Sequence, residues 1–425
     1  MKKILKNPLF LWTSFANLMS DFGDVVYYLA LMNYVLLLEQ SNLALSVITL
    51  SESIPIFFQF FTGYWADRTK HKIRVIQLTL LLRVSFYLIL GWVMSFQPAL
   101  WILIVAAAIN FISDIAGYYE NGLFIPVNLR MISNEDRGDF LGFSQGLQMA
   151  GMIIFQAAGA LLISIMSHSQ LAYLNALSFL IPLIVMTSLK QRFNRLFDER
   201  PYQGSDQSLK QQGNILKRAK SSVKEVLDEM NKIPEIKLCL VIAPVINGIF
   251  AVFPAILTLT MKANPAFQIR TPVFTLAIFQ TLMILGAILG SFLVMSLLKK
   301  VNLEKLLFFS VGLTFLMSIC LYFQNIFGLL LVFFIIGVIS GAINPKLNTA
   351  VMNSVAEDKI GRINGGIGTY FQMGVLLMRI IFSGLFIFVS AKELALSSLA
   401  ISLIFILFVY YSKRKEKSIK NEVSN

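Results

Sequence analysis

The chain has 425 residues, of which 56% are hydrophobic and 14% are charged, whereas an average soluble protein is roughly 45 to 50% apolar and about 25% charged. This composition excludes an ordinary soluble fold. The formal net charge of +13 would suggest nucleic-acid binding if it lay on a soluble surface, so the positions of the Lys and Arg residues decide what it means.

Apolar runs long enough to cross a bilayer follow one another along nearly the whole chain. A membrane helix needs about 20 apolar residues, and short polar segments separate these runs. We therefore predict an all-α polytopic membrane protein with twelve transmembrane helices, at residues 9–38, 43–65, 74–96, 98–121, 138–165, 170–189, 235–261, 271–298, 305–324, 326–349, 362–390 and 394–411.

The Lys and Arg residues lie almost entirely in alternate connections between the predicted helices. If both termini are cytoplasmic, the cytoplasmic segments hold 31 of the 36 Lys and Arg residues. Such an excess is typical of the cytoplasmic side. The pattern predicts cytoplasmic N- and C-termini in a bacterial cell membrane, with no nucleic-acid partner. The apolar run after Met1 lacks a small-residue cleavage site, so we expect it to be retained as a helix.

A long polar stretch divides the chain into two halves of six predicted helices. We expect an N-terminal bundle at 1–189, a cytoplasmic linker at 190–234, a C-terminal bundle at 235–411 and a basic cytoplasmic tail at 412–425. Glu135 and Asp136 recur as Glu357 and Asp358, 222 positions later, which indicates an internal duplication. Parallel repeats of this kind place a binding site between pseudo-symmetric halves. Within the linker, 215–230 has an apolar helical face and is expected to lie on anionic lipid, a regulatory partner helix being the alternative.

The segment after the second predicted helix reads Gly-Tyr-Trp-Ala-Asp-Arg-Thr-Lys-His-Lys, residues 63–72. It resembles the loop signature of the major facilitator superfamily, with a Lys where the second Gly of that signature stands. The resemblance implies the fold of that superfamily and a cytoplasmic gate. In such a gate the Gly allows close helix packing and the Asp pairs with basic groups near the start of the eleventh helix. The implied gate residues are Gly63, Asp67, Arg68, Lys72 and Arg362.

Two further segments resemble the branch that contains macrolide-efflux proteins and the enterobactin exporter: Ser20, Gly23 and Asp24 in the first helix, and residues 142–145 at the start of the fifth. Gly142, Gly151 and Gly159 keep the spacing of an antiporter signature, although Phe155, Gln156 and Ala160 depart from it. The resemblance implies export. Independently, Gly pairs four apart allow helices to approach closely: 142 and 146, 286 and 290, 337 and 341.

Six ionisable residues fall deep inside predicted spans, where a charge costs roughly 2.5 to 3.5 kcal/mol, so each is a functional candidate. Four of the six are acids and two are bases. Desolvation favours the neutral form of a carboxyl group that lacks a counter-charge, and such a group can carry a proton. We expect proton coupling at Asp21, Asp24 and Glu52, with Arg83, Arg379 and Asp114 as charge partners in the membrane. Asp114 and Glu120 lie nearer the cytoplasmic end and could instead bond the loop arginines.

Polar residues in several spans recur at helical spacing, which places them on single faces. These faces are expected to line the substrate cavity, although polar groups in membrane helices also bond one another for structural reasons. Besides the acids, the stripes contain Asn17, Tyr28, Gln145, Gln148, Gln156 and Gln372.

The leading hypothesis is a secondary transporter that exports an amphipathic small molecule, such as a drug, peptide-like metabolite or siderophore, in exchange for protons. A lipid-linked substrate flippase, a proton symport importer and a non-transporting sensor are the alternatives. No enzyme, cofactor or metal is expected, because His71 and His168 lie apart without ligand spacing and no phosphate-binding loop is present. The expected partners are the small-molecule substrate, protons and membrane lipids, and the oligomeric state stays open.

Overall fold

The computed structural model describes residues 7–131, 137–199, 228, 230, 234–354 and 360–423. The chain divides into two compact units, Met1–Lys217 and Arg218–Asn425. The linker helix expected at 215–230 lies outside the described residues, apart from Asp228 and Met230, as do Glu135, Asp136, Glu357 and Asp358.

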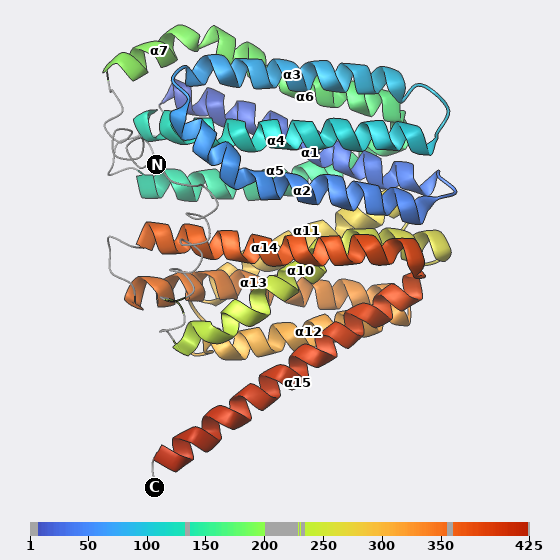
Figure 1. Cartoon of the computed structure of the whole chain (residues 1–425), viewed down its shortest axis with the longest axis vertical. Helices are drawn as coiled ribbons and strands as arrows, with labels where there is room; N and C mark the ends of the chain where they lie inside the picture. The colour runs from blue at the N-terminus through green and yellow to red at the C-terminus, as the bar shows by residue number, and fades with distance from the viewer. Residues whose placement is uncertain are drawn as a thin grey trace. The chain divides into compact units, whose positions relative to one another are not determined.

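The first unit consists of helices, drawn from blue to green in Figure 1. They are α1 (Pro8–Leu36), α2 (Ser41–Arg68), α3 (Lys72–Val93), α4 (Leu100–Met131), α5 (Arg137–Ile165), α6 (His168–Ser188) and the short α7 (Lys190–Glu199).

The second unit, yellow-green to red, is helical as well. Its helices are α10 (Pro234–Ala263), α11 (Pro272–Leu293), α12 (Leu303–Tyr322), α13 (Ile326–Ser354), α14 (Ile360–Phe388) and α15 (Ala391–Val423).

Eleven of the described helices are long and apolar enough to span a membrane. The 29-residue α1 has the length for a twelfth, but its polar residues, including Asp21 and Asp24, lower its mean hydropathy. The predicted all-helical membrane fold is confirmed. Helices α4, α13 and α15 continue beyond the predicted spans, to Met131, Ser354 and Val423, because hydropathy marks only the part of a helix that crosses hydrocarbon.

The same helix pairings recur in the two units. In the first, α2 packs on α4, α1 packs on α5 and α6, and α3 packs on α4 and α6. In the second, α11 packs on α13, α10 packs on α14 and α15, and α12 packs on α13 and α15. If α1 to α6 are matched in chain order with α10 to α15, each of these packing pairs in the first unit has a counterpart in the second. Each unit is a bundle with the same internal plan.

Local sequence explains where several helices begin. The Asn7 side chain accepts hydrogen bonds from the backbone amides of Leu9 and Phe10, at 3.1 and 3.3 Å, and Pro8 occupies the first helical position. Ser167 and Gln170 form a reciprocal capping box at the start of α6. Thr271 caps α11 ahead of Pro272. These caps satisfy backbone amides that have no partner within the helix.

The close contact of α11 and α13 depends on the predicted glycine pairs. A Cβ at Gly290 would lie 2.0 Å from the Val338 carbonyl oxygen, and one at Gly341 would lie 2.1 Å from the Ala287 carbonyl oxygen. Gly286 and Gly337 face each other's backbone in the same way. The expected packing role is confirmed for these four glycines. For Gly146 it stays a prediction, because a Cβ there would meet nothing within 4 Å among the described residues.

Candidate functional site

Asp24 and Arg83 form an ion pair between α1 and α3. The Arg83 Nη2 donates to both carboxylate oxygens of Asp24, at 3.2 and 3.1 Å. Only 5% of the Arg83 side chain is exposed, against 43% of the Asp24 side chain. The guanidinium is therefore buried in the wall of the bundle, while its carboxylate partner borders accessible space.

Two other helices hold the Arg83 guanidinium in place. Its Nε donates to the Ser113 hydroxyl of α4 at 2.9 Å, and its face lies over the Phe179 ring of α6, 3.7 Å from the ring centre. A Cβ at Gly117 would already touch the guanidinium at 3.6 Å. Hydrogen bonding and a cation–π contact fix the position of the charge.

Gly23 brings α1 close enough to α6 for this geometry. A Cβ there would lie 1.8 Å from the Ser178 hydroxyl and 2.2 Å from the Asn175 side-chain oxygen. Both side chains are buried. The residue before Asp24 must therefore be glycine, since any side chain would push α1 away from α6 and change the place of the carboxylate.

A second cluster joins α2, α3 and α4 around Asn110, which is only 5% exposed. Its amide nitrogen donates to Glu52 at 2.8 Å and to Asp114 at 3.2 Å, and its oxygen accepts from the Tyr87 hydroxyl at 3.1 Å. The Tyr87 ring packs edge-on against Tyr27, with centroids 4.9 Å apart. One amide thus connects two of the predicted membrane carboxylates.

Asn110→Ala is expected to lower the free energy of unfolding by about 1 to 3 kcal/mol, because its three partners lose a buried hydrogen bond. Unfolding in detergent with increasing SDS would measure the loss. Ser85→Ala is the control, since the exposed Ser85 hydroxyl donates to the Leu81 carbonyl of its own helix. Equal stability of the two variants would show that the Asn110 network contributes nothing.

Asp21 lies beside a polar cavity of about 220 Å³ formed by α1, α4 and α5. Asn17 and Gln148 line it with Asp21. The cavity includes Phe10 in the first turn of α1. It therefore extends from the end of the unit where α1 begins to a point one turn before Asp24.

Four residues of α4 near the site were not predicted to belong to it. The sequence indicated a possible role at the gate for Glu120, and it did not single out Asn110, Ser113 or Gly117. Glu120 is buried and accepts a 3.3 Å hydrogen bond from the Thr79 hydroxyl. With Asn110, Ser113 and Gly117, it steps along α4 by three, four and three residues. The spacing that reveals the α1 stripe could have revealed this one too.

The remaining predicted cavity residues lie in different places. Tyr28 is half-buried on α1, and Gln156 is buried on α5, where its side-chain oxygen has no hydrogen-bond partner in the described structure. Gln145 lies in α5, but its side chain is outside the described residues. Gln372 and Arg379 lie on α14 of the second unit, the first exposed and the second half-buried.

The predicted gate segment forms the end of α2 and the start of α3. The Lys72 Nζ donates to the Ala66 carbonyl at 2.6 Å, and the Arg68 guanidinium stacks over the Tyr64 ring at 3.8 Å. Within the described residues, a Cβ at Gly63 would meet nothing within 4 Å, so its expected role in close packing stays a prediction. The close contact of α2 and α4 at this point depends on Gly122 of α4, where a Cβ would lie 2.8 Å from the Ala66 Cβ. The side chains of Asp67 and Arg362 lie outside the described residues.

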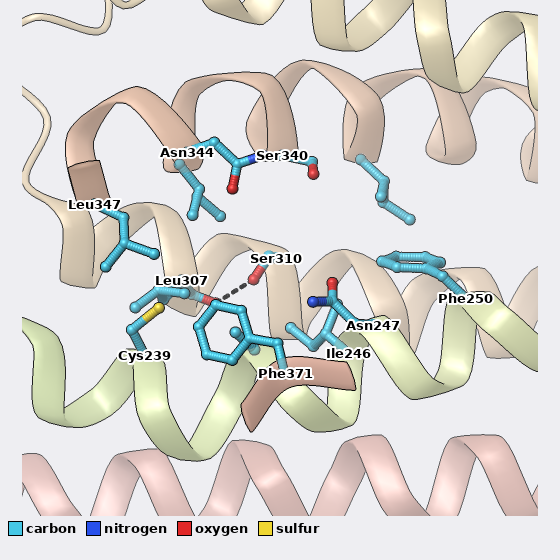
Figure 2. A pocket seen from close by; sticks show the side chains of 13 residues that line it. Cys239, Ile246, Asn247, Phe250, Leu307, Ser310, Ser340, Asn344, Leu347 and Phe371 are labelled. Carbon is cyan, nitrogen blue, oxygen red and sulfur yellow. Dashed lines mark hydrogen bonds between the residues drawn. The ribbon is translucent and has the colours of Figure 1, made fainter. Parts of the chain in front are cut away.

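The second unit contains a cavity of about 60 Å³ between α10, α12, α13 and α14. Figure 2 shows Asn344 and Ser340 on one side of it and Asn247 and Ser310 on the other, with Phe250 and Phe371 nearby. The Ser310 hydroxyl donates to the Leu307 carbonyl at 2.7 Å. Cys239 also lines this cavity. Among the described residues no charged side chain lines it, so the polar groups that they offer are amides and hydroxyls.

The helical plan and the membrane spans agree with a family comparison. The family model for the Major Facilitator Superfamily matches residues 9–378 and again residues 238–424. The chain belongs to the major facilitator superfamily. It is therefore a secondary transporter and a multi-pass membrane protein rather than an enzyme. No curated protein matches the sequence.

Solved structures share the fold at low sequence identity. The nucleoside transporter NupG is 13% identical, with a TM-score of 0.67 over 94% of this chain and 98% of that one. The peptide transporter POT is 12% identical, with a TM-score of 0.66 over 94% of each chain. A bacterial homologue of the iron transporter ferroportin, in an inward-facing state, is 12% identical, with a TM-score of 0.64 over 94% of this chain and 97% of that one.

Proposed function

We propose that the protein exports an amphipathic small molecule in exchange for protons. The observation that carries this proposal is the pairing of the buried Arg83 with the accessible carboxylate of Asp24. A proton can reach a carboxylate in this position, and the charge state of the carboxylate determines whether its ion pair with Arg83 persists. Asp24 is the proposed proton carrier, with Asp21 as the group that exchanges protons with the polar cavity beside it.

The coupling follows from the cost of an unpaired buried charge. Protonation of Asp24 breaks the ion pair with Arg83, and a buried charge that loses its direct partner is costly. The protonated and deprotonated carriers therefore favour different arrangements of groups around Arg83. A substrate that binds better to one of these arrangements is linked to the proton by the difference in its two affinities.

Export is supported by the resemblance to an antiporter signature on α5. Two of its glycines, Gly151 and Gly159, lie against α1: a Cβ at Gly151 would be 3.0 Å from the Leu18 side chain, and one at Gly159 would be 2.8 Å from the Leu29 side chain. They set the distance between α5 and the helix that carries Asp24. Gly142 and Gln145, which also contribute to the resemblance, have no described side-chain surroundings.

An amphipathic cargo is supported by the chemistry of the second unit. Its cavity combines the amides of Asn247 and Asn344 with the rings of Phe250 and Phe371. Amides can bond both donors and acceptors, and aromatic rings provide apolar contact. This mixture suits part of a molecule that has both polar and apolar faces.

The direction of the proton gradient that drives accumulation tests the antiport assignment. In proteoliposomes, an antiporter accumulates its substrate on the acidic side whichever way it is inserted, whereas a proton symporter accumulates it on the alkaline side. We expect accumulation in liposomes whose lumen is more acidic than the medium, abolished by a protonophore. The probes are ethidium, uridine and dialanine, with protein-free liposomes as the control. Accumulation only under the reversed gradient would establish symport.

A further inference from the structure

A basic cavity lies at the end of the first unit where α3 begins and α6 gives way to α7. Its volume is about 410 Å³, and it is lined by Lys70, His71, Lys72, Ile73, Arg74, Lys190 and Asn194. It shares no lining residue with the cavity beside Asp21. It is therefore separate from the proposed coupling site.

The short helix α7 forms one wall of this basic cavity. It contacts α3, α4 and α6, and Phe193 is fully buried. Lys190 and Asn194, which line the cavity, are four residues apart and so lie on one face of α7. The buried ring anchors α7 to the bundle and keeps this polar face directed at the start of α3.

The charge of the cavity is available to a ligand. Lys70, Arg74 and Lys190 are exposed, whereas the Lys72 Nζ already donates to the Ala66 carbonyl. No carboxylate is among the lining residues that the structure describes. The start of α3 has no side-chain cap and no acidic residue in its first turn, so its first backbone amides add to the positive potential. All these groups favour an anion.

The position of the cavity indicates which anion would occupy it. The span Lys72–Val93 begins here and the span His168–Ser188 ends here, so the cavity lies at the level of the lipid headgroups. We propose that it binds the phosphate of an anionic phospholipid, with Lys70, Arg74 and Lys190 as its ligands. Basic residues at a membrane surface attract anionic lipids, and Arg and Lys bind phosphate through charge-assisted hydrogen bonds.

The test compares a variant with Lys70, Arg74 and Lys190 all replaced by Gln with the wild type. The matched control replaces Lys299, Lys300 and Lys305, which are exposed in the second unit, so that it loses the same charge elsewhere. Each protein is titrated with phosphatidylglycerol and, separately, with phosphatidylcholine. Native mass spectrometry counts the bound lipids, and circular dichroism verifies helix content. A parallel titration uses inorganic phosphate alone.

We expect the first variant to lose at least about tenfold in apparent affinity for phosphatidylglycerol, with no change for phosphatidylcholine. The control should retain wild-type affinity. An equal loss in the control would overturn the proposal, because it would show general attraction to the charged protein. Binding of phosphatidylglycerol by the first variant at wild-type affinity would overturn it as well. Displacement of the lipid by inorganic phosphate would identify a site for a soluble anion instead.

Discussion

Asp24→Asn is expected to abolish proton-driven accumulation of every probe that the wild type transports. An amide can still accept a hydrogen bond from Arg83, but it cannot release a proton or supply a negative charge. The measurement is accumulation in proteoliposomes with an acidic lumen, beside counterflow exchange without a proton gradient. Counterflow should persist at a raised substrate concentration, because exchange of substrate for substrate does not require the carrier to return without cargo. The apparent affinity for the substrate should fall, because the amide resembles the protonated carrier, which an antiported substrate binds less well.

The control for this variant is Glu39→Gln, which removes an exposed carboxylate from the connection between α1 and α2. It should transport as the wild type does. Gradient-driven accumulation that survives in Asp24→Asn would remove Asp24 from the coupling mechanism. Loss of both accumulation and counterflow would point instead to a role in substrate binding or folding, and thermal unfolding would separate these two.

Gly290→Ala is expected to destabilise the second unit by about 1 to 3 kcal/mol, the usual cost of overpacking. The new methyl group would lie 2.0 Å from the Val338 carbonyl oxygen, which belongs to the backbone and cannot rotate away. Helices α11 and α13 would have to separate along their contact. Both cysteines of the chain, Cys239 and Cys320, lie in this unit, so a thiol-reactive fluorescent dye reports its unfolding on heating.

Gly312→Ala provides the matched control on α12, because a Cβ at Gly312 would meet nothing within 4 Å. Alanine should be neutral or stabilise by up to about 1 kcal/mol there, since it favours the helix more than glycine does. The two variants make the same chemical change and should differ in sign. If Gly290→Ala unfolded at the same temperature as Gly312→Ala, the backbone contact of α11 and α13 would not determine stability.

The course of the helices could be predicted from the sequence because lipid imposes one strong rule. A spanning segment must bond its own backbone and expose apolar side chains, so hydropathy and segment length together identify it. The predicted span 9–38 corresponds to α1 at Pro8–Leu36, and 138–165 corresponds to α5 at Arg137–Ile165. Helix α7 was missed as a separate element, because it lies along the bundle end and its 10 residues include several charges.

The candidate site was only partly predictable. Asp24 and Arg83 each stand out as a charge in an apolar span, but their pairing depends on how α1 and α3 are rotated about their axes. The spacing of residues in the sequence shows which of them share a face of one helix. It does not show which face of a neighbouring helix that face contacts. For the same reason the link from Glu52 through Asn110 to Asp114 crosses helices and has no signature along the chain.

The close approach of α1 to α6 at Gly23 limits how the Asp24 carboxylate can move from one environment to another. The Ser178 and Asn175 side chains lie close to the α1 backbone at this point, so a rotation or translation of α1 against α6 would require these buried side chains to move. We therefore expect α1 and α6 to move together as one rigid body. Asp24 can therefore be exposed or hidden only by a change in its own rotamer or by movements of other elements around it. A disulfide or other crosslink that ties α1 to α6 should consequently leave the transport cycle intact.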